Sequence, residues 1–292
     1  MNYDNKKELE LLKNSIYLIK KNKINEAEII LFELIKKKEF LLDCLIYIGI
    51  CKIKKNDSDQ AIHYLNKALK VNPNNELANL NLGLIYFGKK IFLESIKYLD
   101  KVYKNNKKNI VAIYHLGLAY MGINKLEESE KFFETLLKFN PKDEIALLNL
   151  GVLYEKKLEH EKSININKEL IKINNKNINA YNNIGNSYFN LFNFEEAINY
   201  YKKCISINDK YAPAYRNLGI LYSELKEFDQ SIKYLKFAID LNRNDFISLF
   251  TLSKVYLSNN NYSEGFKLYE YRKQLNNQQN INYLKKNFNS QE

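Results

Sequence analysis

Apolar residues recur along the chain at spacings of three and four, in short runs separated by polar turn residues. This spacing places the apolar side chains on one face of a helix. Two such runs follow each other in the stretch from Ala180 to Lys210, AYNNIGNSYFNLFNFEEAINYYKKCISINDK. The same pattern returns every 34 residues without an insertion. It therefore predicts a stack of identical helix pairs instead of one globular core.

Three positions of the 34-residue unit hold one type of residue nearly throughout. The first is glycine, or serine in its place, at Ser15, Gly49, Gly83, Gly117, Gly151, Gly185, Gly219 and Ser253. Twelve residues later comes a small residue: Ala27, Ala61, Ser95, Ser129, Ser163, Ala197, Ser231 or Gly265. Sixteen residues after the first comes a large one in all but one repeat: Leu31, Leu65, Leu99, Phe133, Tyr201, Leu235 or Tyr269. We expect the small residues to allow two helices to approach closely, while the large ones fill the space between repeats.

This combination of positions resembles the tetratricopeptide repeat family. The resemblance implies an all-α fold, a right-handed superhelical solenoid of antiparallel helix pairs, with eight repeats in residues 8–279. Residues 1–7 are then an N-terminal tail, and residues 280–292 are a C-terminal tail or a short capping helix. The uninterrupted period argues against the related pentatricopeptide repeats, which favour a longer one. Asn167 stands in the slot for a large apolar residue, so we expect an unpaired polar group and a weak point there.

No motif for catalysis or for metal binding stands out. His63 and His160 have no histidine or cysteine at metal-ligand spacing. Carboxylate pairs recur at the starts of second helices, where they stabilise the helix N-terminus: Glu127–Glu128 and Glu195–Glu196. The three cysteines fall in slots for small buried residues: Cys44, Cys51 and Cys204. The sequence therefore predicts a protein that is not an enzyme and that has no metal and no cofactor.

The net charge of +11 is uneven, since residues 1–109 carry 21 lysines against 13 acidic residues. Many of these lysines lie where first helices end: Lys20, Lys21, Lys23, Lys54, Lys55, Lys89 and Lys90. They either complement helix dipoles and keep one edge soluble, or bind an acidic partner, a nucleic acid or an anionic membrane. Most aromatic residues occupy core slots, which favours a protein partner over nucleic acid.

The sequence also predicts the cellular location. No apolar run approaches the ~20 residues of a membrane span. The first residues lack the apolar segment of a signal peptide. Together with the unpaired cysteines, these features predict a cytoplasmic protein.

A ladder of amide side chains is the candidate binding site. The residue two before each glycine faces the concave groove in this family, and five successive repeats place there Asn81, His115, Asn149, Asn183 and Asn217. A carboxamide both donates and accepts, so it can pair with the N–H and C=O of a peptide backbone. The resemblance to the asparagine ladder of O-GlcNAc transferases implies a grip on an extended chain. The alternative is that these side chains bond to neighbouring backbone and stiffen the stack.

The sixth repeat adds further amides to one helix face: Asn179, Asn182, Asn186 and Asn190. With Arg216 of the next repeat, this patch is a candidate for holding a peptide carboxylate or an acidic side chain. A solvated polar face is the alternative. Groove slots of repeats two to five are instead apolar, including Ile46, Ile50, Ile53, Leu80, Leu84, Phe87, Tyr114, Leu118, Met121, Leu148 and Val152. These residues either form an exposed binding patch or pack against the next repeat.

We therefore expect a non-catalytic scaffold for protein–protein interaction that binds an extended or amphipathic peptide in its groove. One alternative is a substrate-docking or accessory module of a glycosyltransferase system, because Asn260 to Arg272 is similar to closing repeats that precede bacterial sugar-transferase domains. A weaker alternative is an adaptor for nucleic acid or an anionic surface through the basic N-terminal repeats. The pattern of a chaperone carboxylate clamp fails, since Asn182, Ile247 and Thr251 replace its basic residues.

Overall fold

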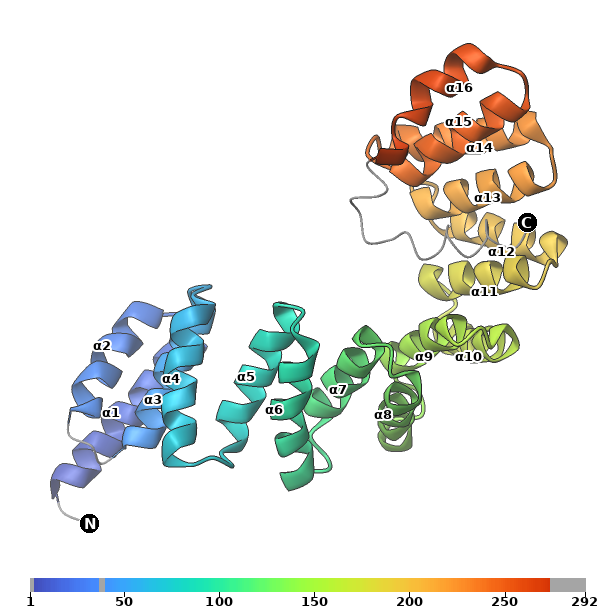
Figure 1. Cartoon of the computed structure of the whole chain (residues 1–292). Coiled ribbons are helices and arrows are strands. Elements are labelled where there is room, and N and C mark those ends of the chain that lie inside the picture. The colour runs from blue at the N-terminus through green and yellow to red at the C-terminus, as the bar shows by residue number, and fades with distance from the viewer. Residues whose placement is uncertain (1–2, 37–39, 274–292) are drawn as a thin grey trace. The chain divides into compact units, whose positions relative to one another are not determined.

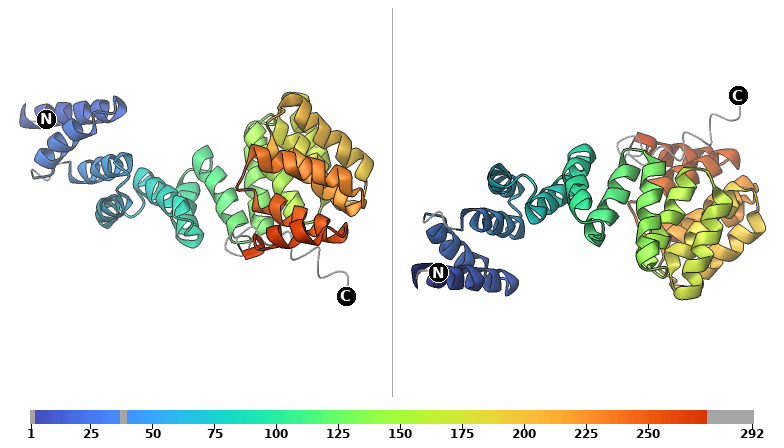
Figure 2. Two further views of the ribbon diagram at one scale, coloured as in Figure 1. Left: turned by 90° about the horizontal axis from the view of Figure 1, so that it is seen from above. Right: turned by 90° about the horizontal axis from the view of Figure 1, so that it is seen from below.

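The computed structural model describes residues 3–36 and 40–273, which form sixteen α-helices in tandem pairs (Figure 1). No strand occurs in these residues. The chain divides into two units, Met1–Pro141 and Lys142–Glu292. Each odd-numbered helix packs against the even-numbered helix that follows it, and Figure 2 shows these pairs from two further sides. The expected all-α stack of helix pairs is confirmed.

The first unit holds the helices of repeats one to four: α1 Tyr3–Lys20, α2 Ile24–Ile35, α3 Leu41–Lys54, α4 Ser58–Val71, α5 Glu76–Gly88, α6 Phe92–Asn105, α7 Ile110–Gly122 and α8 Leu126–Phe139. The second unit holds those of repeats five to eight: α9 Glu144–Lys156, α10 His160–Ile173, α11 Ile178–Asn190, α12 Phe194–Ile207, α13 Ala212–Glu224, α14 Phe228–Leu241, α15 Phe246–Ser258 and α16 Tyr262–Tyr269. The first helix begins at Tyr3, within the segment 1–7 that was predicted to be an N-terminal tail. The predicted C-terminal segment, residues 280–292, lies outside the described residues.

Asparagine and aspartate set the turns between repeats. Asn75 accepts a hydrogen bond from the backbone N–H of Ala78 at 2.9 Å, and Asp143 accepts one from Ala146 at 2.9 Å. Such caps satisfy N–H groups that the first turn of a helix leaves unpaired. In the same turns, Asn72 accepts from the N–H of Asn74 at 3.1 Å. Part of the high asparagine content therefore serves the connections and not a ligand.

The glycine positions allow the two helices of a repeat to approach closely. A Cβ atom on Gly83 would lie 2.6 Å from the Leu99 side chain, and one on Gly185 would lie 2.6 Å from the Tyr201 ring. The partner is in each case the large residue sixteen positions later. The expected role of the small residues is confirmed, and the large ones pack directly onto the glycine of their own repeat.

Serine in the small slot has a specific partner in several repeats. Ser95 donates to the carbonyl of Gly83 at 2.8 Å, and Ser231 donates to the carbonyl of Gly219 at 2.7 Å. These hydroxyls are buried but paired, as burial requires. The cysteines are fully buried as predicted, and burial raises the pKa of Cys44 and Cys51 to about 11 and that of Cys204 to about 12.

Candidate functional site

Odd-numbered helices form the inner side of each stack, because they contact one another across successive repeats. In the second unit α9 contacts α11, α11 contacts α13, and α13 contacts α15; in the first unit α1, α3, α5 and α7 do the same. The predicted groove residues belong to these helices. They fall in two groups, with Asn81 and His115 in the first unit and the other predicted site residues in the second.

Three ladder residues bond to their own helix backbone. The Asn81 amide donates to the carbonyl of Leu77 at 2.8 Å, and the Asn149 amide donates to Ile145 at 2.7 Å. Nδ1 of His115 lies 2.8 Å from the carbonyl oxygen of Val111. These contacts correspond to the alternative considered for the ladder. Within residues 3–36 and 40–273, each side chain uses one of its polar groups in this contact and the other has no partner, and the three residues are half-buried.

The ladder residues of the sixth and seventh repeats bond to other side chains. Nδ2 of Asn217 donates to Oδ1 of Asn182 at 2.9 Å and to Oδ1 of Asn186 at 3.0 Å. The hydroxyl of Tyr201 also donates to Asn186, at 2.9 Å. Asn179 accepts from the hydroxyl of Tyr211 at 3.3 Å. Most of the predicted asparagine face is therefore one connected surface on α11 and α13.

Arg216 has a partner inside the protein. Its guanidinium lies 3.2 Å from both carboxylate oxygens of Asp245, which is almost fully buried. Asp245 also accepts from the backbone N–H of Ser248 at 3.3 Å and thereby caps α15. The charge of Arg216 is thus already neutralised by the eighth repeat. It positions α15 instead of offering a free cation to a carboxylate.

Asn167 is buried and paired, which corrects the expectation of an unpaired group. Its amide donates to the carbonyl of Ser163 at 2.8 Å, and its oxygen accepts from Nδ2 of Asn183 at 3.4 Å. The side chain fills the space above Gly151, as the large apolar residue does in other repeats. One ladder residue, Asn183, thereby contacts the core of the preceding repeat.

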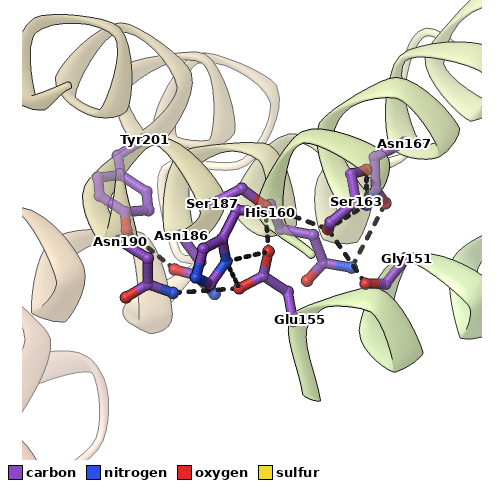
Figure 3. A network of polar contacts seen from close by, with 10 residues as sticks. Gly151, Glu155, His160, Ser163, Asn167, Asn186, Ser187, Asn190 and Tyr201 are labelled. Carbon is purple, nitrogen blue, oxygen red and sulfur yellow. Dashed lines mark hydrogen bonds and ion pairs between the residues drawn. The ribbon is translucent and has the colours of Figure 1, made fainter. Parts of the chain in front are cut away.

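Around Asn167 lies a polar network that the sequence analysis missed (Figure 3). The hydroxyl of Ser187 donates to Glu155 in a short hydrogen bond, and its oxygen lies 3.1 Å from that of Ser163. Asn190 and His160 also contact the Glu155 carboxylate, at 3.1 and 3.2 Å. A signal was available, since glutamate and serine here occupy slots that hold apolar residues in most repeats.

The apolar groove slots of the first unit pack largely against neighbouring repeats. Ile46 is buried, and Ile50 and Ile53 pack against the core cluster that contains it. Phe87 packs against the next cluster, with its ring centroid 5.1 Å from that of His115. For these residues the packing alternative holds. Ile50, Ile53 and Phe87 stay half-exposed on these first helices.

Part of the lysine-rich edge of the first unit forms ion pairs between repeats. Lys52 and Lys55 lie 3.0 and 2.5 Å from the carboxylate of Glu28, and Lys89 lies 2.6 Å from that of Asp59. Burial raises the pKa of Glu28, but hydrogen bonds and charge from Lys55 and Lys52 outweigh it and hold the pKa below its usual value. These lysines therefore connect neighbours in addition to any external role.

Models of the tetratricopeptide repeat match residues 52–110, 110–143, 178–211 and 212–245. Together these segments make up more than half of the chain. The chain belongs to the tetratricopeptide repeat (TPR) family. No curated protein is similar enough to the chain to count as a match.

Solved structures share the fold of this chain. MamA is 29% identical, with a TM-score of 0.56, covering 59% of this chain and 94% of its own. A TPR protein from Parabacteroides merdae is 19% identical, with a TM-score of 0.62 and coverage of 86% and 98%. The anaphase-promoting complex assembly Cut9–Hcn1 is 16% identical, with a TM-score of 0.57 and coverage of 82% and 48%. The last two show the fold alone.

TPR arrays generally mediate protein–protein interactions, and this chain is such an array. No helix in the described part of the TPR array is both long and apolar enough to cross a membrane. No group of three or more histidine, cysteine or acidic side chains placed to hold a metal occurs in residues 3–36 and 40–273.

Proposed function

We propose that the TPR chain is a non-catalytic scaffold that binds an extended peptide segment of a partner protein along its first helices. In the second unit the contact residues are Asn149, Asn182, Asn183, Asn186 and Asn217. In the first unit Asn81 and His115 occupy the corresponding positions on α5 and α7. Arg216 acts through Asp245 by fixing α15, and Asn179 lies at the margin.

One observation carries this proposal. Nδ2 of Asn217 is used by the oxygens of Asn182 and Asn186. The Nδ2 groups of these two residues and Oδ1 of Asn217 have no partner in the part of the chain that the structure describes. Two donors and an acceptor therefore lie side by side on α11 and α13. This set complements the C=O and N–H groups of an extended backbone.

The internal hydrogen bonds add to the proposal instead of competing with it. They hold the amides of Asn182, Asn186 and Asn217 in fixed orientations before a ligand arrives. A preorganised surface loses less side-chain entropy on binding. A backbone-directed contact also explains why amides, with no charge of their own, recur in this position.

The test uses amide-to-acid exchange. A peptide selected by display against the whole protein is measured by calorimetry with the double variant Asn182→Asp and Asn186→Asp. Aspartate keeps the oxygen that accepts from Asn217 but replaces the free donor with an acceptor. Losing two hydrogen bonds of about 0.5–1.5 kcal/mol each predicts affinity at least fivefold weaker, with unchanged helix content.

The matched control is Gln230→Glu, a change at an exposed amide on α14, the second helix of the next repeat. It should bind the selected peptide like the parent protein. Equal affinity of the double variant and the parent would refute the groove proposal. The identity of a co-purified partner would distinguish the two alternative functions. A co-purified sugar transferase would indicate an accessory module of a glycosyltransferase system. RNA or DNA that binds in a salt-sensitive way would indicate an adaptor that acts through the basic N-terminal repeats, residues 3–109.

A further inference from the structure

A cleft of about 840 Å³ lies between α10 and α12, the second helices of the fifth and sixth repeats. It is separate from the groove residues, which belong to first helices. Tyr200 and Ile171 line it together with Tyr181 from α11. Its other lining residues are mostly polar and include several lysines. The cleft thus combines an aromatic floor with a basic rim.

The aromatic floor is uncovered because of one substitution between repeats. The Tyr181 and Tyr200 rings lie 6.2 Å apart between centroids, and the equivalent pair one repeat later, Tyr215 and Tyr234, lies 6.4 Å apart. In that later repeat the Phe237 ring covers Tyr215, with centroids 5.6 Å apart. Lys203 stands in the position of Phe237. The sixth repeat therefore lacks the side chain that closes the cleft in the seventh.

The basic rim is only partly neutralised. Lys172 pairs with Glu169 at 2.6 Å, but both side chains are well exposed, so this ion pair contributes little. Lys202 and Lys203 have no acidic partner within residues 3–36 and 40–273, and both are exposed. Lys168 donates to the hydroxyl of Tyr188 at 3.2 Å, which raises the pKa of Lys168 and keeps it charged. Glu196 is the one acidic lining residue.

We propose that this cleft binds an acidic peptide segment of a second partner protein. An aromatic side chain of the segment covers Tyr181 and Tyr200 as Phe237 covers Tyr215. Carboxylates on either side of it pair with Lys172, Lys202 and Lys203. The aromatic stack adds to the affinity beyond the apolar area that it buries, and the lysines orient the segment and raise its association rate.

The shape and charge of the cleft select this occupant. A volume of about 840 Å³ exceeds one side chain and fits a short peptide segment. The chain's own residues 274–292 do not complement it, since they carry two lysines and one glutamate. The proposal therefore adds a second binding surface to the scaffold, on the opposite helices of its repeats.

Fluorescence anisotropy with a labelled Glu-Glu-Phe-Glu-Glu peptide tests the proposal. We expect saturable binding that weakens at least fivefold when alanine replaces the phenylalanine, and again when glutamine replaces the glutamates. In the protein, Lys203→Phe should close the cleft and abolish binding. Lys203→Glu should weaken binding at least tenfold, whereas the matched charge change Lys236→Glu, one repeat away on α14, should not.

Three results would overturn the proposal. The first is the absence of saturable binding to the acidic aromatic peptide. The second is an equal loss with Lys236→Glu, which would show a general charge effect. The third is binding of a single-stranded oligonucleotide, but not of the peptide, with the same dependence on Lys203. The groove variants at Asn182 and Asn186 should leave peptide binding at the cleft unchanged.

Discussion

The two units build the same helix pairs but join successive repeats in different ways. In the first unit Leu65, Leu99 and Phe133 pack onto the glycines, and neighbouring repeats are joined by lysine–carboxylate pairs near the surface. In the second unit Asn167 packs onto one glycine, and a buried network joins the fifth repeat to the sixth.

This difference shows what the repeat fixes and what it leaves open. The close approach of two helices needs a small residue and a side chain that fills the space, whether leucine, tyrosine or asparagine. A polar filler requires polar neighbours, because a buried polar group must be paired. Ser163, Asn183 and Ser187 provide them, so the polar residues of the second unit occur together. The surface that results is the candidate binding site.

The largest expected effect is a cavity at the filling position of the first unit. Leu99 is fully buried against Gly83, so Leu99→Ala should lower the free energy of unfolding by about 3 kcal/mol. Asn167→Ala should cost less, about 2 kcal/mol, because it removes fewer apolar contacts and some hydrogen bonds. Urea denaturation followed by circular dichroism measures both.

An equal cost at the two positions would contradict this comparison. Ala68→Gly, on an even-numbered helix of the first unit, is a control for small changes inside a helix and should cost about 1 kcal/mol. If Asn167→Ala lowered the free energy of unfolding more than Leu99→Ala, the polar network, and not the filled volume, would dominate the stability of the second unit.

The fold was predictable because its determinants are local and repeated. The slot for glycine or serine and the slot sixteen residues later recur with the same spacing in all eight repeats, so each repeat tests the pattern again. The state of Asn167 was not predictable in this way. Its partners are a carbonyl four residues back and an amide sixteen residues ahead. Neither is visible in the slot pattern, which marks Asn167 only as an exception.

A second prediction tests that correction directly. Asn167→Leu restores the residue type of the first unit, yet it leaves Asn183 and the buried Ser163 hydroxyl with fewer partners. We expect the free energy of unfolding to fall by about 1–2 kcal/mol. Denaturant midpoints of the parent and variant proteins measure it. If the variant is more stable than the parent, the hydrogen bonds of Asn167 contribute less than leucine packing would, and Asn167 is a weak point although it is paired.

The turn between the two helices of a repeat allows a test with a smaller expected effect, because equivalent turn positions in the two units can be changed in opposite directions. Asn124 in the first unit and Phe192 in the second both have a positive φ, 61° and 59°. Asparagine tolerates this conformation, whereas a bulky residue is strained by about 1–2 kcal/mol. Because Phe192 is 80% exposed, and the Phe194 ring lies 6.1 Å away between centroids, Phe192→Asn gives up little packing and should stabilise by about 0.5–1 kcal/mol.

The reverse change, Asn124→Phe, should destabilise by a similar amount. Thermal unfolding of the two variants checks both signs in one experiment. Destabilisation by Phe192→Asn would show that the ring contact with Phe194 outweighs the strain. In that case the exposed phenylalanine has a structural reason for its place in the turn.

The candidate site was only half predictable, for an electrostatic and a geometric reason. Asparagines that repeat at one slot or share one helix face can be recognised in a sequence, so Asn182, Asn186 and Asn217 were candidates before the structure was known. The pairing of Arg216 with Asp245 spans 29 residues and depends on how α13 meets α15. Glu155 was missed because a single carboxylate in the sequence does not indicate a site. Its role depends on its contacts with Ser187 and Asn190, which only the structure shows.

The smallest expected effect concerns the ion pairs of the first unit. Contacts with Lys55 and Lys52 lower the pKa of Glu28 below its unfolded value. The stability that Glu28 contributes is therefore present above the unfolded pKa and is lost as pH falls through the folded pKa.

Glu28→Gln should lower the free energy of unfolding by about 0.5–1 kcal/mol at pH 7, and the difference should disappear in strong acid. Glu26→Gln, a change at an exposed residue that pairs with Lys23, is the matched control and should change the stability little at any pH. Urea midpoints of the three proteins across this pH range decide the matter: a Glu28 effect that persists in strong acid would mean that shape, and not charge, joins the first repeats.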